Sequence, residues 1–451
     1  MQLAEAAAAL HARSSGGDPL FTGVSTDSRS IRAGELFVAL RGERFDGHEF
    51  LKAVAAANAA AAMVDSAYAG EYPLPALVVE DTRRALGDLA RYWRARFMPA
   101  LVALAGSNGK TTVKEMLAAI LRKHAGEGQE TSAVLATRGN LNNDIGLPLT
   151  ILALRHGHRW CAIELGMNHK GEIAYLAGIA RPTVALVNNA QREHLEFMRS
   201  VEEVAEENAS VYDALPADGV AVVNADDAHA DFFRRRAGGR PIVDFGLQAG
   251  MVSGRYRLGH LASEIELKTP AGGARATLAI PGLHNVRNAL AAAACAVAVG
   301  VPVRTIGEGL SAFRPYTGRL QVKQARGGAT VIDDTYNANP DSVRAAIDVL
   351  AGCPGPTALV LGDMGEVGEQ GAEFHREVGA YARAKAIDRL LGLGEATRHA
   401  VEAFGPGAKH FATVEELVSK VEGNTVLVKG SRFMRMERVV AALTGTAQGG
   451  H

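Results

Sequence analysis

Short apolar runs alternate with helical patterns along the middle of the chain. Stretches with the 3.6-residue period of amphipathic helices separate four mostly apolar runs, at residues 101–105, 160–164, 183–188 and 220–224. Apolar runs of this length are typical of strands buried on both faces, so their alternation with helices predicts a parallel sheet covered by helices. A shorter, more strand-like pattern predicts a small antiparallel addition at 241–280, and a helix is expected at 286–299.

The regions on either side predict two further α/β units. The first contains strands expected at 36–40, 62–64 and 77–79 and helices expected at 50–62 and 81–97, the second of which Asp81 and Thr82 can cap. The last unit begins near Arg314 and Pro315, with strands expected at 330–333, 358–361, 389–392 and 425–428 and helices expected at 342–350, 373–384, 396–403 and 414–421. We therefore expect an α/β protein with three domains, at residues 1–98, 99–314 and 315–451.

Charge excludes two classes of partner. Across 451 residues, 48 Lys and Arg stand against 49 Asp and Glu, which gives a formal net charge of −1. A protein that wraps nucleic acid or coats an anionic membrane needs a basic excess, so we expect no nucleic-acid partner. The longest strongly apolar run, at 289–303, is shorter than the ~20 residues that span a bilayer, so no membrane insertion is expected.

Cysteine usage and the first residues bear on where the protein is expected in the cell. The three cysteines, Cys161, Cys295 and Cys353, form no CxxC pair, and neither a disulfide framework nor a cysteine-rich zinc site is predicted. Residues 1–10 contain Glu5 and no basic start, unlike a signal peptide. We expect a cytoplasmic protein.

The stretch GSNGKTT lies between an expected buried strand and an expected helix. In such a loop, backbone N–H groups and the helix N-terminus bind phosphate oxygens, the lysine adds a positive charge, and the hydroxyl holds Mg²⁺. The Walker pattern has its first glycine where this chain has Leu104, and the form here is the shorter GxxGKTT. The context favours nucleotide binding by Gly106, Ser107, Asn108, Gly109, Lys110, Thr111 and Thr112 over the alternative, a glycine turn with a solvated lysine.

Three polar clusters follow expected strands of the same sheet, at the edge where open α/β sheets bind ligands. They are Glu164 with residues 168–169, residues 188–189 leading to His194, and residues 140–144. An acidic residue that ends a strand suits a magnesium ligand because hard cations prefer oxygen donors. Taken alone, a carboxylate such as Glu164 is more often at the surface or in a salt bridge, and the imidazole of His194 is an unusual magnesium ligand.

GSNGKTT is the first of a series of motifs that continues with NLNNDIG at 140–146, IELGMNH at 163–169, HNVRNALAA at 284–292, GRL at 318–320, DDTYNANPDS at 333–342 and LGDMGEVG at 361–368. This order resembles the Mur ligases, the ATP-dependent amide-forming enzymes of peptidoglycan precursor synthesis, over nearly the whole chain. The resemblance implies a three-domain architecture: a substrate-binding N-terminal domain, a central phosphate-loop ATPase domain with a mainly parallel sheet, and a C-terminal Rossmann-like domain.

Residues 27–29, 36–40 and 46–48 are similar to the UDP-sugar-binding domain of the two later ligases of the family. Three motifs, NNDIG, GDMGEVG and LVKGSR at 427–432, distinguish between the two later ligases, and they resemble the member that adds D-alanyl-D-alanine. The DNPR signature of the member that adds diaminopimelate or lysine is absent, and the chain has Asn337-Ala338-Asn339-Pro340 instead.

The resemblance also implies roles for individual residues. Lys110, His194 and Arg319 would be catalytic; Thr111, Glu164 and His194 would hold Mg²⁺. Asn285 and Asn288 would approach the adenine of ATP, Arg319 its phosphates and Asp334 its ribose. Substrate contacts would come from Ser25, Asp27, Ser28, Arg29, Gly47 and His48 at the UDP end, and from Asn142, Asn143, Asp144, Asn337, Asp363, Lys429 and Arg432 elsewhere.

One position departs from the wider family. Many members carry a lysine, modified to a carbamate, in a VAxAKGE motif on the helix after the HLE segment, and the matching position here is Asn208. A carbamate would bring negative charge to a second magnesium ion, and asparagine cannot. Either Glu207 or Glu206 supplies that charge, or substrate and water hold the second ion; our hypothesis is that one of the two glutamates does.

The implied reaction joins D-alanyl-D-alanine to UDP-N-acetylmuramoyl-tripeptide. The terminal carboxylate of the tripeptide would attack the γ-phosphate of ATP, and the amine of the dipeptide would then attack the resulting acyl phosphate. Two alternatives stay open: a Mur ligase that adds a single amino acid, and a phosphate-loop NTPase that switches a partner. By analogy with the family we expect a monomer whose C-terminal domain closes onto the nucleotide.

Overall fold

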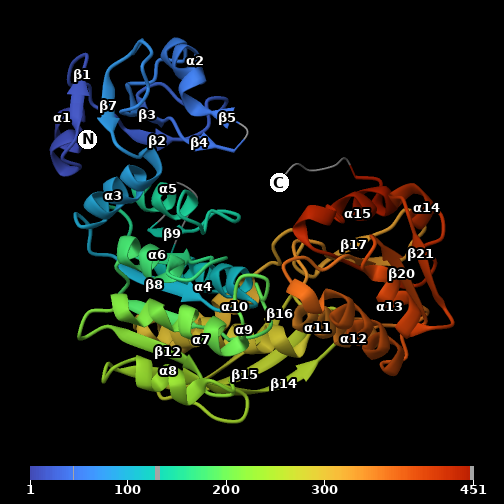
Figure 1. The fold of residues 1–451 in the computed structure, drawn as a ribbon. Coiled ribbons are helices and arrows are strands. Elements are labelled where there is room, and N and C mark those ends of the chain that lie inside the picture. Colours follow the sequence, from blue (N-terminus) through green and yellow to red (C-terminus); the bar gives the residue numbers. More distant parts are fainter. Residues whose placement is uncertain (44, 127–132, 447–451) are drawn as a thin grey trace.

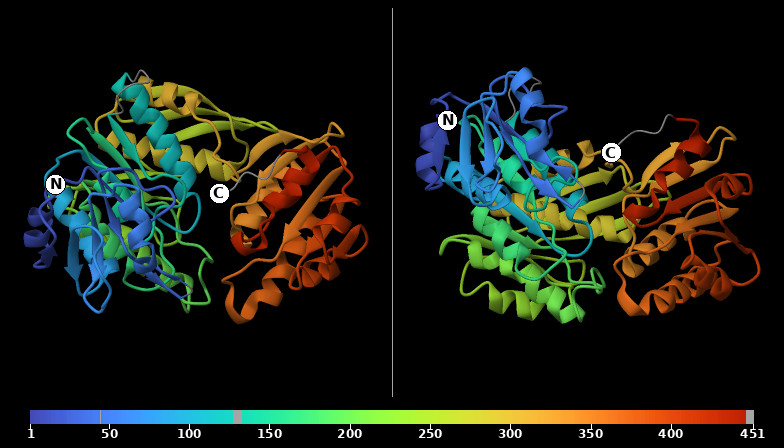
Figure 2. Two further views of the ribbon diagram at one scale, coloured as in Figure 1. Left: turned by 90° about the horizontal axis from the view of Figure 1, so that it is seen from above. Right: turned by 45° about the horizontal axis from the view of Figure 1, so that its top comes forward.

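The computed structural model describes residues 1–43, 45–126 and 133–446, and it arranges them as three α/β lobes, each built on its own sheet (Figure 1). The expected three-domain α/β architecture is therefore confirmed. The N-terminal lobe lies above the central one and the C-terminal lobe lies beside it, and two further views show the same separation (Figure 2). The predicted boundaries at 98/99 and 314/315 fall in the connections between helix and strand that join these lobes.

The N-terminal domain has a five-stranded sheet of order β1-β7-β6-β3-β2, in which only β1 runs antiparallel to its neighbour. Its elements are α1 (Leu3–Ala9), β1 (Arg13–Ser15), β2 (Gly23–Ser25), β3 (Glu35–Val38), β4 (Arg41–Gly42), β5 (Phe45–Asp46), η1 (Gly47–Phe50), α2 (Leu51–Ala56), β6 (Ala61–Asp65), β7 (Ala76–Val79) and α3 (Thr82–Arg94). The helix expected at 50–62 is too long. It ends at Ala56 because Asn58 takes the left-handed conformation, with φ of 60°, and the chain turns into β6.

Helix α3 joins the N-terminal domain to the central one. Asp81 caps its start by accepting hydrogen bonds from the backbone N–H groups of Arg83 and Arg84, as the sequence predicts. At its end the buried guanidinium of Arg94 donates to the carbonyls of Ala180 (2.7 Å) and Arg181 (3.0 Å), at the end of α6 (Glu172–Ala180) in the central domain. This anchoring fixes the N-terminal domain over one edge of the central sheet.

The central domain has a six-stranded, entirely parallel sheet of order β13-β12-β11-β8-β10-β9. Its elements are β8 (Ala100–Ala105), α4 (Lys110–Ala125), β9 (Val134–Ala136), α5 (Gly146–Leu152), β10 (Trp160–Glu164), α6, β11 (Val184–Val187), α7 (Val201–Ala209), η2 (Ser210–Ala214), β12 (Val220–Asn224), α8 (Ala230–Arg236), β13 (Ile242–Phe245), α9 (Leu283–Ala298) and α10 (Val303–Ala312). The apolar runs predicted from the sequence are its buried inner strands.

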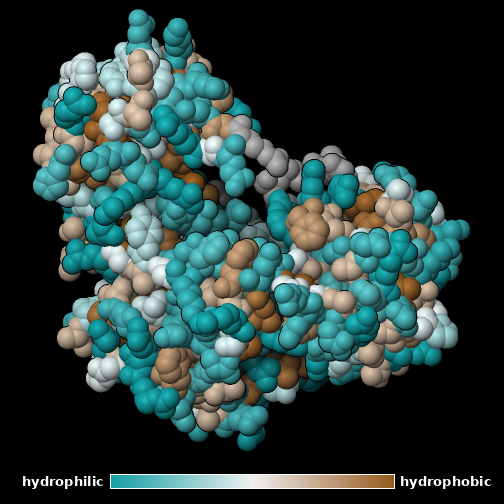
Figure 3. Space-filling model, viewed as in Figure 1, coloured by the Kyte–Doolittle hydropathy of each residue, from teal (hydrophilic) through white to brown (hydrophobic). Residues whose placement is uncertain are grey.

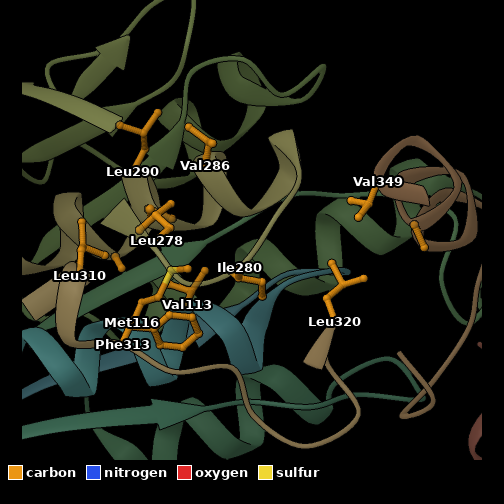
Figure 4. Close-up of a cluster of buried hydrophobic side chains, with 14 of the residues drawn as sticks. Val113, Met116, Leu278, Ile280, Val286, Leu290, Leu310, Phe313, Leu320 and Val349 are labelled. Atoms are coloured by element: carbon orange, nitrogen blue, oxygen red, sulfur yellow. The ribbon is translucent and has the colours of Figure 1, made fainter. Parts of the chain in front are cut away.

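Two apolar cores cover the two faces of the central sheet. On one face, Val113 and Met116 of α4 pack with Val286 and Leu290 of α9 and with Phe313 (Figure 4). Helices α3, α5, α6 and α7 contribute to the core on the other face. Because both faces are buried, the loops at the carboxyl ends of the strands are the part of the sheet left open to a ligand.

The antiparallel addition predicted at 241–280 forms, but over a shorter range. Strand β13 joins the central sheet in parallel, and the addition consists of β14 (Ser253–Leu258), β15 (Ser263–Thr269) and β16 (Gly272–Leu278). Along β15 buried and exposed residues alternate, as expected of a sheet with one face in the core.

The C-terminal domain has a six-stranded sheet of order β17-β18-β22-β19-β20-β21, parallel except for β17. Its elements are β17 (Gln321–Gln324), β18 (Thr330–Asp334), α11 (Pro340–Ala351), β19 (Thr357–Gly362), η3 (Gly368–Gln370), α12 (Gly371–Ala384), β20 (Arg389–Leu393), α13 (Thr397–Phe404), β21 (Ala408–Phe411), α14 (Val414–Val418), β22 (Thr425–Lys429), η4 (Arg432–Met434) and α15 (Glu437–Thr444). The four inner strands were predicted and both edge strands were missed. No helix in the described part of the chain combines the length and apolarity needed to cross a membrane.

Candidate active site

The loop between β8 and α4 requires glycine at two positions. Gly106 has φ of 130°, and a Cβ there would lie 3.0 Å from the backbone nitrogen of Asn188. Gly109 has φ of 84°, and a Cβ there would lie 2.3 Å from Oδ1 of Asn288. No side chain caps the first turn of α4, so its backbone N–H groups face the loop, as in a phosphate-binding site.

Three amide side chains, two of them buried, hold this loop in place. The backbone N–H of Gly106 donates to Oδ1 of Asn208 (2.7 Å), and that of Asn108 donates to Oδ1 of Asn189 (2.8 Å). Nδ2 of Asn188 donates to the carbonyl of Asn108 (2.7 Å). The loop is therefore fixed before any ligand binds, which favours binding because little ordering remains to be done.

The Lys110 side chain folds back over the loop. Its Nζ donates to the carbonyls of Gly106 (2.5 Å) and Ser107 (3.1 Å) and lies 3.5 Å from Oε1 of Glu193. The adjacent Thr111 hydroxyl donates to Oε1 of Glu164 (3.2 Å). Two carboxylates thus flank the start of α4: Glu193 lies beside Lys110, and Glu164 lies beside Thr111.

Glu164 has the geometry of a cation ligand. It ends β10, and its Oε1 accepts hydrogen bonds from Thr111 and from Nδ2 of Asn142 (2.8 Å). Its Oε2 is buried and has no hydrogen-bond partner. A buried carboxylate oxygen without a partner is unfavourable, and a divalent cation held jointly by Glu164 and Thr111 would satisfy it. The residues present therefore fit Mg²⁺.

His194 lies between two carboxylates. Its Nε2 is 3.4 Å from Oε1 of Glu193 and its Nδ1 is 2.8 Å from Oε2 of Glu366, which belongs to the C-terminal domain. Burial alone would lower the pKa of His194, but hydrogen bonding to the two carboxylates outweighs it and raises that pKa to about 9. The ring is therefore protonated at neutral pH in this arrangement, and a role for His194 as a metal ligand stays a prediction.

Arg319 reaches the phosphate loop from the segment before β17. Its Nη2 donates to Oγ1 of Thr111 (3.3 Å), and its guanidinium lies 4.0 Å from the centre of the Tyr336 ring. Its Nε is buried without a partner, so one further donor is available to a ligand. Stacking on Tyr336 holds the cation in position beside the loop.

Two cavities border the phosphate loop. The first, of about 720 Å³, is lined by residues of all three domains, and the space-filling view shows the hollow between the N-terminal and C-terminal lobes (Figure 3). Of the predicted residues, it is lined by Ser107, Asn108, Gly109, Lys110, Thr111, Asn142, Asn143, Asp144, Glu164, His194, Arg319, Asn337, Lys429 and Arg432. Among the described residues, no three His, Cys, Asp or Glu side chains form a self-sufficient metal site, so a bound cation would need ligand oxygens from a substrate.

The second cavity, of about 520 Å³, lies on the other side of the loop. The predicted residues that line it are Asn108, Gly109, Thr112, Asn285, Asn288, Arg319, Asp334 and Lys429. Asn288 donates to Oδ1 of Asn285 (3.1 Å) and accepts from Nδ2 of Asn188 (3.1 Å), so the two predicted adenine residues also support the loop. Lys429 donates to Oδ2 of Asp334 (2.6 Å), and burial lowers the pKa of this lysine.

The predicted UDP-end residues lie away from both cavities, in the N-terminal domain. Ser25 ends β2, and Asp27, Ser28 and Arg29 follow it; the Arg29 side chain is 88% exposed and pairs with Asp27 at 2.9 Å. These residues are open to a ligand that extends from the first cavity toward the N-terminal sheet.

Gly47 and His48 are part of the interior of the N-terminal domain. A Cβ at Gly47 would lie 2.8 Å from the carbonyl oxygen of Leu40. The His48 ring is buried, with Nδ1 2.5 Å from Oδ1 of Asp46 and Nε2 accepting from the backbone N–H of Asp65 (3.0 Å). Both ring nitrogens of His48 are therefore occupied within the domain, which leaves the backbone of Gly47 and His48 for a contact with the UDP group, and that contact stays a prediction.

Asp363 also has a structural role. Its Oδ1 accepts from the backbone N–H of Thr397 (2.9 Å), the first residue of α13, and its carboxylate packs against Gly394. It lines neither cavity. The carboxylate is therefore engaged at the start of α13, and the predicted substrate contact of Asp363 stays a prediction.

The hypothesis that Glu207 or Glu206 replaces a lysine carbamate is wrong. Both carboxylate oxygens of Glu207 accept backbone hydrogen bonds at the start of α6, from Gly171 (2.8 Å) and Ile173 (2.8 Å), and Glu206 is exposed. Asn208, at the position of the lysine, is buried; its Nδ2 donates to the carbonyl of Val204 (2.9 Å) while its Oδ1 holds Gly106.

Several residues of the first cavity were missed by the sequence reasoning. Arg83 of α3 donates to Asp144 across the junction of the N-terminal and central domains (Nη2 to Oδ1, 2.7 Å). Glu193 and Glu366 face His194 from two domains. The available signals were that Arg83 lies in the first turn of a helix that follows a strand and that Glu193 directly precedes His194.

Three family models match the chain in order: the Mur ligase family, catalytic domain, over residues 20–94; the Mur ligase middle domain over 104–296; and the Mur ligase, glutamate ligase domain, over 318–432. The chain is 40% identical over 438 residues to the UDP-N-acetylmuramoyl-tripeptide–D-alanyl-D-alanine ligase of Escherichia coli (strain K12), covering 95% of each. It is 33% identical over 437 residues to the Bacillus subtilis (strain 168) enzyme of the same name, covering 93% of each.

Solved structures of two proteins match the fold. MurF from Acinetobacter baumannii has a TM-score of 0.90 at 34% identity, over 98% of both chains. MurF ligase from Thermotoga maritima, solved in complex with ADP, has a TM-score of 0.80 at 26% identity, over 95% of this chain and 98% of that one.

Proposed function

The chain belongs to the Mur ligase family, and we propose that it is the ATP-dependent ligase that joins D-alanyl-D-alanine to UDP-N-acetylmuramoyl-tripeptide, with release of ADP and phosphate, in peptidoglycan precursor synthesis. The observation that carries the proposal is the first cavity, where a phosphate loop is exposed to side chains from all three domains. An enzyme that joins three substrates needs such a meeting point, whereas a nucleotide switch does not. The relatives of the same name, which match over almost the whole chain, support the choice of substrates.

The proposed reaction has two stages. In the first, an oxygen of the tripeptide's terminal carboxylate attacks the γ-phosphorus of ATP, the bond to the β,γ-bridging oxygen breaks, and ADP leaves. In the second, the amine of D-alanyl-D-alanine attacks the acyl carbon, loses a proton, and phosphate leaves. Phosphorylation is needed because a free carboxylate has no adequate leaving group, and such chemistry depends on positioning and charge neutralisation.

The residues beside the loop supply that neutralisation. The N–H groups at the start of α4 would bind the phosphates, and Lys110 would exchange its carbonyl contacts for phosphate oxygens. Arg319, which has a buried donor without a partner, would bind the transferred phosphoryl group. The second cavity, with Asn285 and Asn288 on its wall and Asp334 at its edge, would take the nucleoside of ATP.

Thr111 and Glu164 would hold the Mg²⁺ that accompanies ATP. The bound ion would neutralise phosphate charge and orient the phosphates. What this chain contributes is a hydroxyl and a carboxylate already aligned by the hydrogen bond between them, with the amide of Asn142 fixing the rotamer of Glu164.

The remaining predicted contacts arrange the other two substrates. We place the UDP group toward Ser25, Asp27, Ser28 and Arg29, and the peptide along the wall formed by Asn142, Asn143 and Asp144. D-alanyl-D-alanine would approach from the C-terminal side, beside Asn337 and Arg432. We further propose that the protein acts as a monomer in the cytoplasm, where ATP is available.

An assay of ADP release separates the ligase from the alternatives. The purified protein is supplied with Mg²⁺-ATP and UDP-N-acetylmuramoyl-tripeptide, with and without D-alanyl-D-alanine or single amino acids. We expect sustained ADP release only with the dipeptide, matched by pentapeptide product. Two results would exclude the proposed activity. One is a rate of ADP release that does not change when the tripeptide precursor and the dipeptide are added; the other is a single amino acid that supports ADP release as well as the dipeptide does.

A further inference from the structure

We propose that Lys114, a buried lysine of α4, positions Glu164 for the cation that accompanies ATP. The inference rests on the proposed function, because Glu164 is the carboxylate to which that function assigns Mg²⁺. It extends the function to a residue that lines neither cavity beside the phosphate loop. Lys114 would act through the groups that hold Glu164, so it is a positioning residue and not a cation ligand.

Lys114 is a charged residue on a buried face of its helix. Its side chain is fully buried, and the residues three, four and seven positions later on α4, which share its face, are the buried apolar Leu117, Ala118 and Leu121. Lysine is rarely buried to this extent without partners, because taking its charge out of water is costly. An apolar side chain would fill the position at less cost, so the contacts of Nζ are what the lysine contributes.

The Nζ of Lys114 binds the end of β9. It donates to the carbonyl of Thr137 (2.8 Å) and pairs with the carboxylate of Glu115. Thr137 directly follows β9, and its hydroxyl accepts a hydrogen bond from the backbone N–H of Glu164 (2.9 Å), the last residue of β10. Thr137 therefore connects the buried cation to the backbone of the proposed magnesium ligand.

The loop that follows Thr137 provides a second support for Glu164. It contains Asn142, whose Nδ2 donates to Oε1 of Glu164 (2.8 Å). Because Lys114 fixes Thr137, it fixes the point from which this loop departs. The backbone and the side chain of Glu164 thus both depend on the position of one residue, Thr137.

The ring of Tyr316 lies beside Lys114 and the same loop. The Nζ of Lys114 is 5.7 Å from the centre of this ring, within the range of a cation–π interaction. A Cβ at Gly139 would lie 3.5 Å from the Tyr316 hydroxyl oxygen, so the ring packs on the loop two residues after Thr137. The buried cation therefore holds the loop directly, at Thr137, and also attracts the ring that packs on it.

Support of this kind matters because the cation ligand must present one particular oxygen. Oε1 of Glu164 accepts two hydrogen bonds, and the buried Oε2 has no partner and is the oxygen left for the ion. Without the Nζ of Lys114, the end of β9 would lose this donor and the rotamer of Glu164 would be held less firmly. Groups that orient a metal ligand typically account for about 10–100-fold in metal affinity.

Mn²⁺ affinity tests the proposal without catalysis. The full chain is saturated with the nonhydrolysable analogue β,γ-methylene-ATP, and the dissociation constant of Mn²⁺ is measured by electron paramagnetic resonance. Lys114→Met keeps a long buried side chain and removes the Nζ donor, and we expect it to bind Mn²⁺ about tenfold more weakly. The matched control, Lys123→Met, removes an exposed lysine of the same helix and should match the wild type.

Two further measurements separate this role from others. Binding of the analogue in EDTA should be the same in Lys114→Met and the wild type, because the Nζ of Lys114 bonds to Glu115 and Thr137, outside the phosphate loop. If it weakens as much as Mn²⁺ binding does, Lys114 supports the phosphate loop and the proposal is overturned. The proposal is also overturned if urea titration shows a loss of unfolding free energy while Mn²⁺ affinity stays at the wild-type value.

Two remaining outcomes are also decisive. A wild-type chain that binds no Mn²⁺ with the analogue contradicts the proposed function itself. If Lys114→Met does not fold, Thr137→Val decides, because the link from Lys114 to the backbone of Glu164 passes through the hydroxyl that this variant lacks. We expect weaker Mn²⁺ binding with unchanged binding in EDTA, and wild-type Mn²⁺ affinity in Thr137→Val would overturn the role of Lys114.

Discussion

Arg192 and Glu377 join the central and C-terminal domains through two parallel hydrogen bonds, from Nη1 to Oε2 (2.7 Å) and from Nη2 to Oε1 (3.0 Å). Arg192 follows β11 and Glu377 lies on α12. The same guanidinium also binds Asp341 of α11, and the backbone N–H of Arg192 donates to that carboxylate (3.0 Å). Because Arg192 directly precedes Glu193 and His194, this junction also holds the loop that carries them.

Replacing Arg192 with Ala should loosen the junction. Hydrogen bonds with Arg192, and with Arg344 of α11, hold the pKa of Glu377 near 2, so the carboxylate stays charged at neutral pH. In the variant it would keep Arg344 and lose its partner in the central domain. We expect a larger radius of gyration by small-angle X-ray scattering and a KM for ATP raised by about tenfold, or about 1.4 kcal/mol. The control is Arg376→Ala, which removes an exposed arginine from α12, the helix that carries Glu377. If the Arg192 variant had wild-type scattering and a wild-type KM for ATP, the pair of Arg192 and Glu377 would not hold the domains together.

His194 should titrate far above an ordinary histidine. Although burial opposes the charged form, Glu193 and Glu366 raise its pKa to about 9. The stability that its charge contributes is then complete below the unfolded pKa of about 6.5 and is lost as the pH rises through about 9. NMR titration of histidine-labelled protein should give a midpoint near 9 for His194 and a lower one in Glu366→Gln. A midpoint at or below the ordinary value would contradict the ion pairs.

Gly109→Ala should weaken nucleotide binding while the chain still folds. The backbone there has φ of 84°, and the added methyl group would overlap Oδ1 of Asn288. Strain of this kind falls on the phosphate loop itself, so we expect affinity for β,γ-methylene-ATP to fall by about tenfold or more. Gly157→Ala is the matched control, since nothing lies within 4 Å of its Cβ position. Equal affinity in the two variants, measured by calorimetry, would argue against the loop as the phosphate site.

Glu207→Gln should change stability and leave metal binding alone. Both oxygens of Glu207 accept backbone hydrogen bonds at the start of α6, and an amide would place an NH₂ group against one of those donors. We expect a loss of about 1–2 kcal/mol in unfolding free energy, measured by urea titration. A change in Mn²⁺ stoichiometry in this variant would restore Glu207 as a candidate metal ligand.

The inner strands and the phosphate loop could be predicted because each depends on local sequence. Strands such as β8 and β10 are continuous apolar runs, and GSNGKTT has its chemistry and its glycines within seven residues. The edge strands β17 and β21 were missed because QVKQ and AKHF are only partly buried and lack such a run. The helix expected at 50–62 was too long because alanine favours a helix where tertiary structure imposes a turn.

The misjudged site residues share a different cause. The roles of Glu193 and Glu366 depend on two domains meeting at His194, and no spacing in the sequence records that contact. Glu207 was misassigned because a carboxylate on the right helix can equally cap a neighbouring helix, and only the position of α6 decides between them. His48 and Asp363 lie in motifs, yet their side chains serve the fold.

Transfer of oxygen from the tripeptide to phosphate tests the ligase most directly. The enzyme is supplied with ATP, D-alanyl-D-alanine and UDP-N-acetylmuramoyl-tripeptide labelled with ¹⁸O in its terminal carboxylate, and the released phosphate is analysed by mass spectrometry. Because the carboxylate oxygen becomes the bridging oxygen of the acyl phosphate and leaves with phosphorus, each phosphate formed should contain one ¹⁸O atom from the peptide. Phosphate whose new oxygen comes from water would mean simple ATP hydrolysis and would contradict the account.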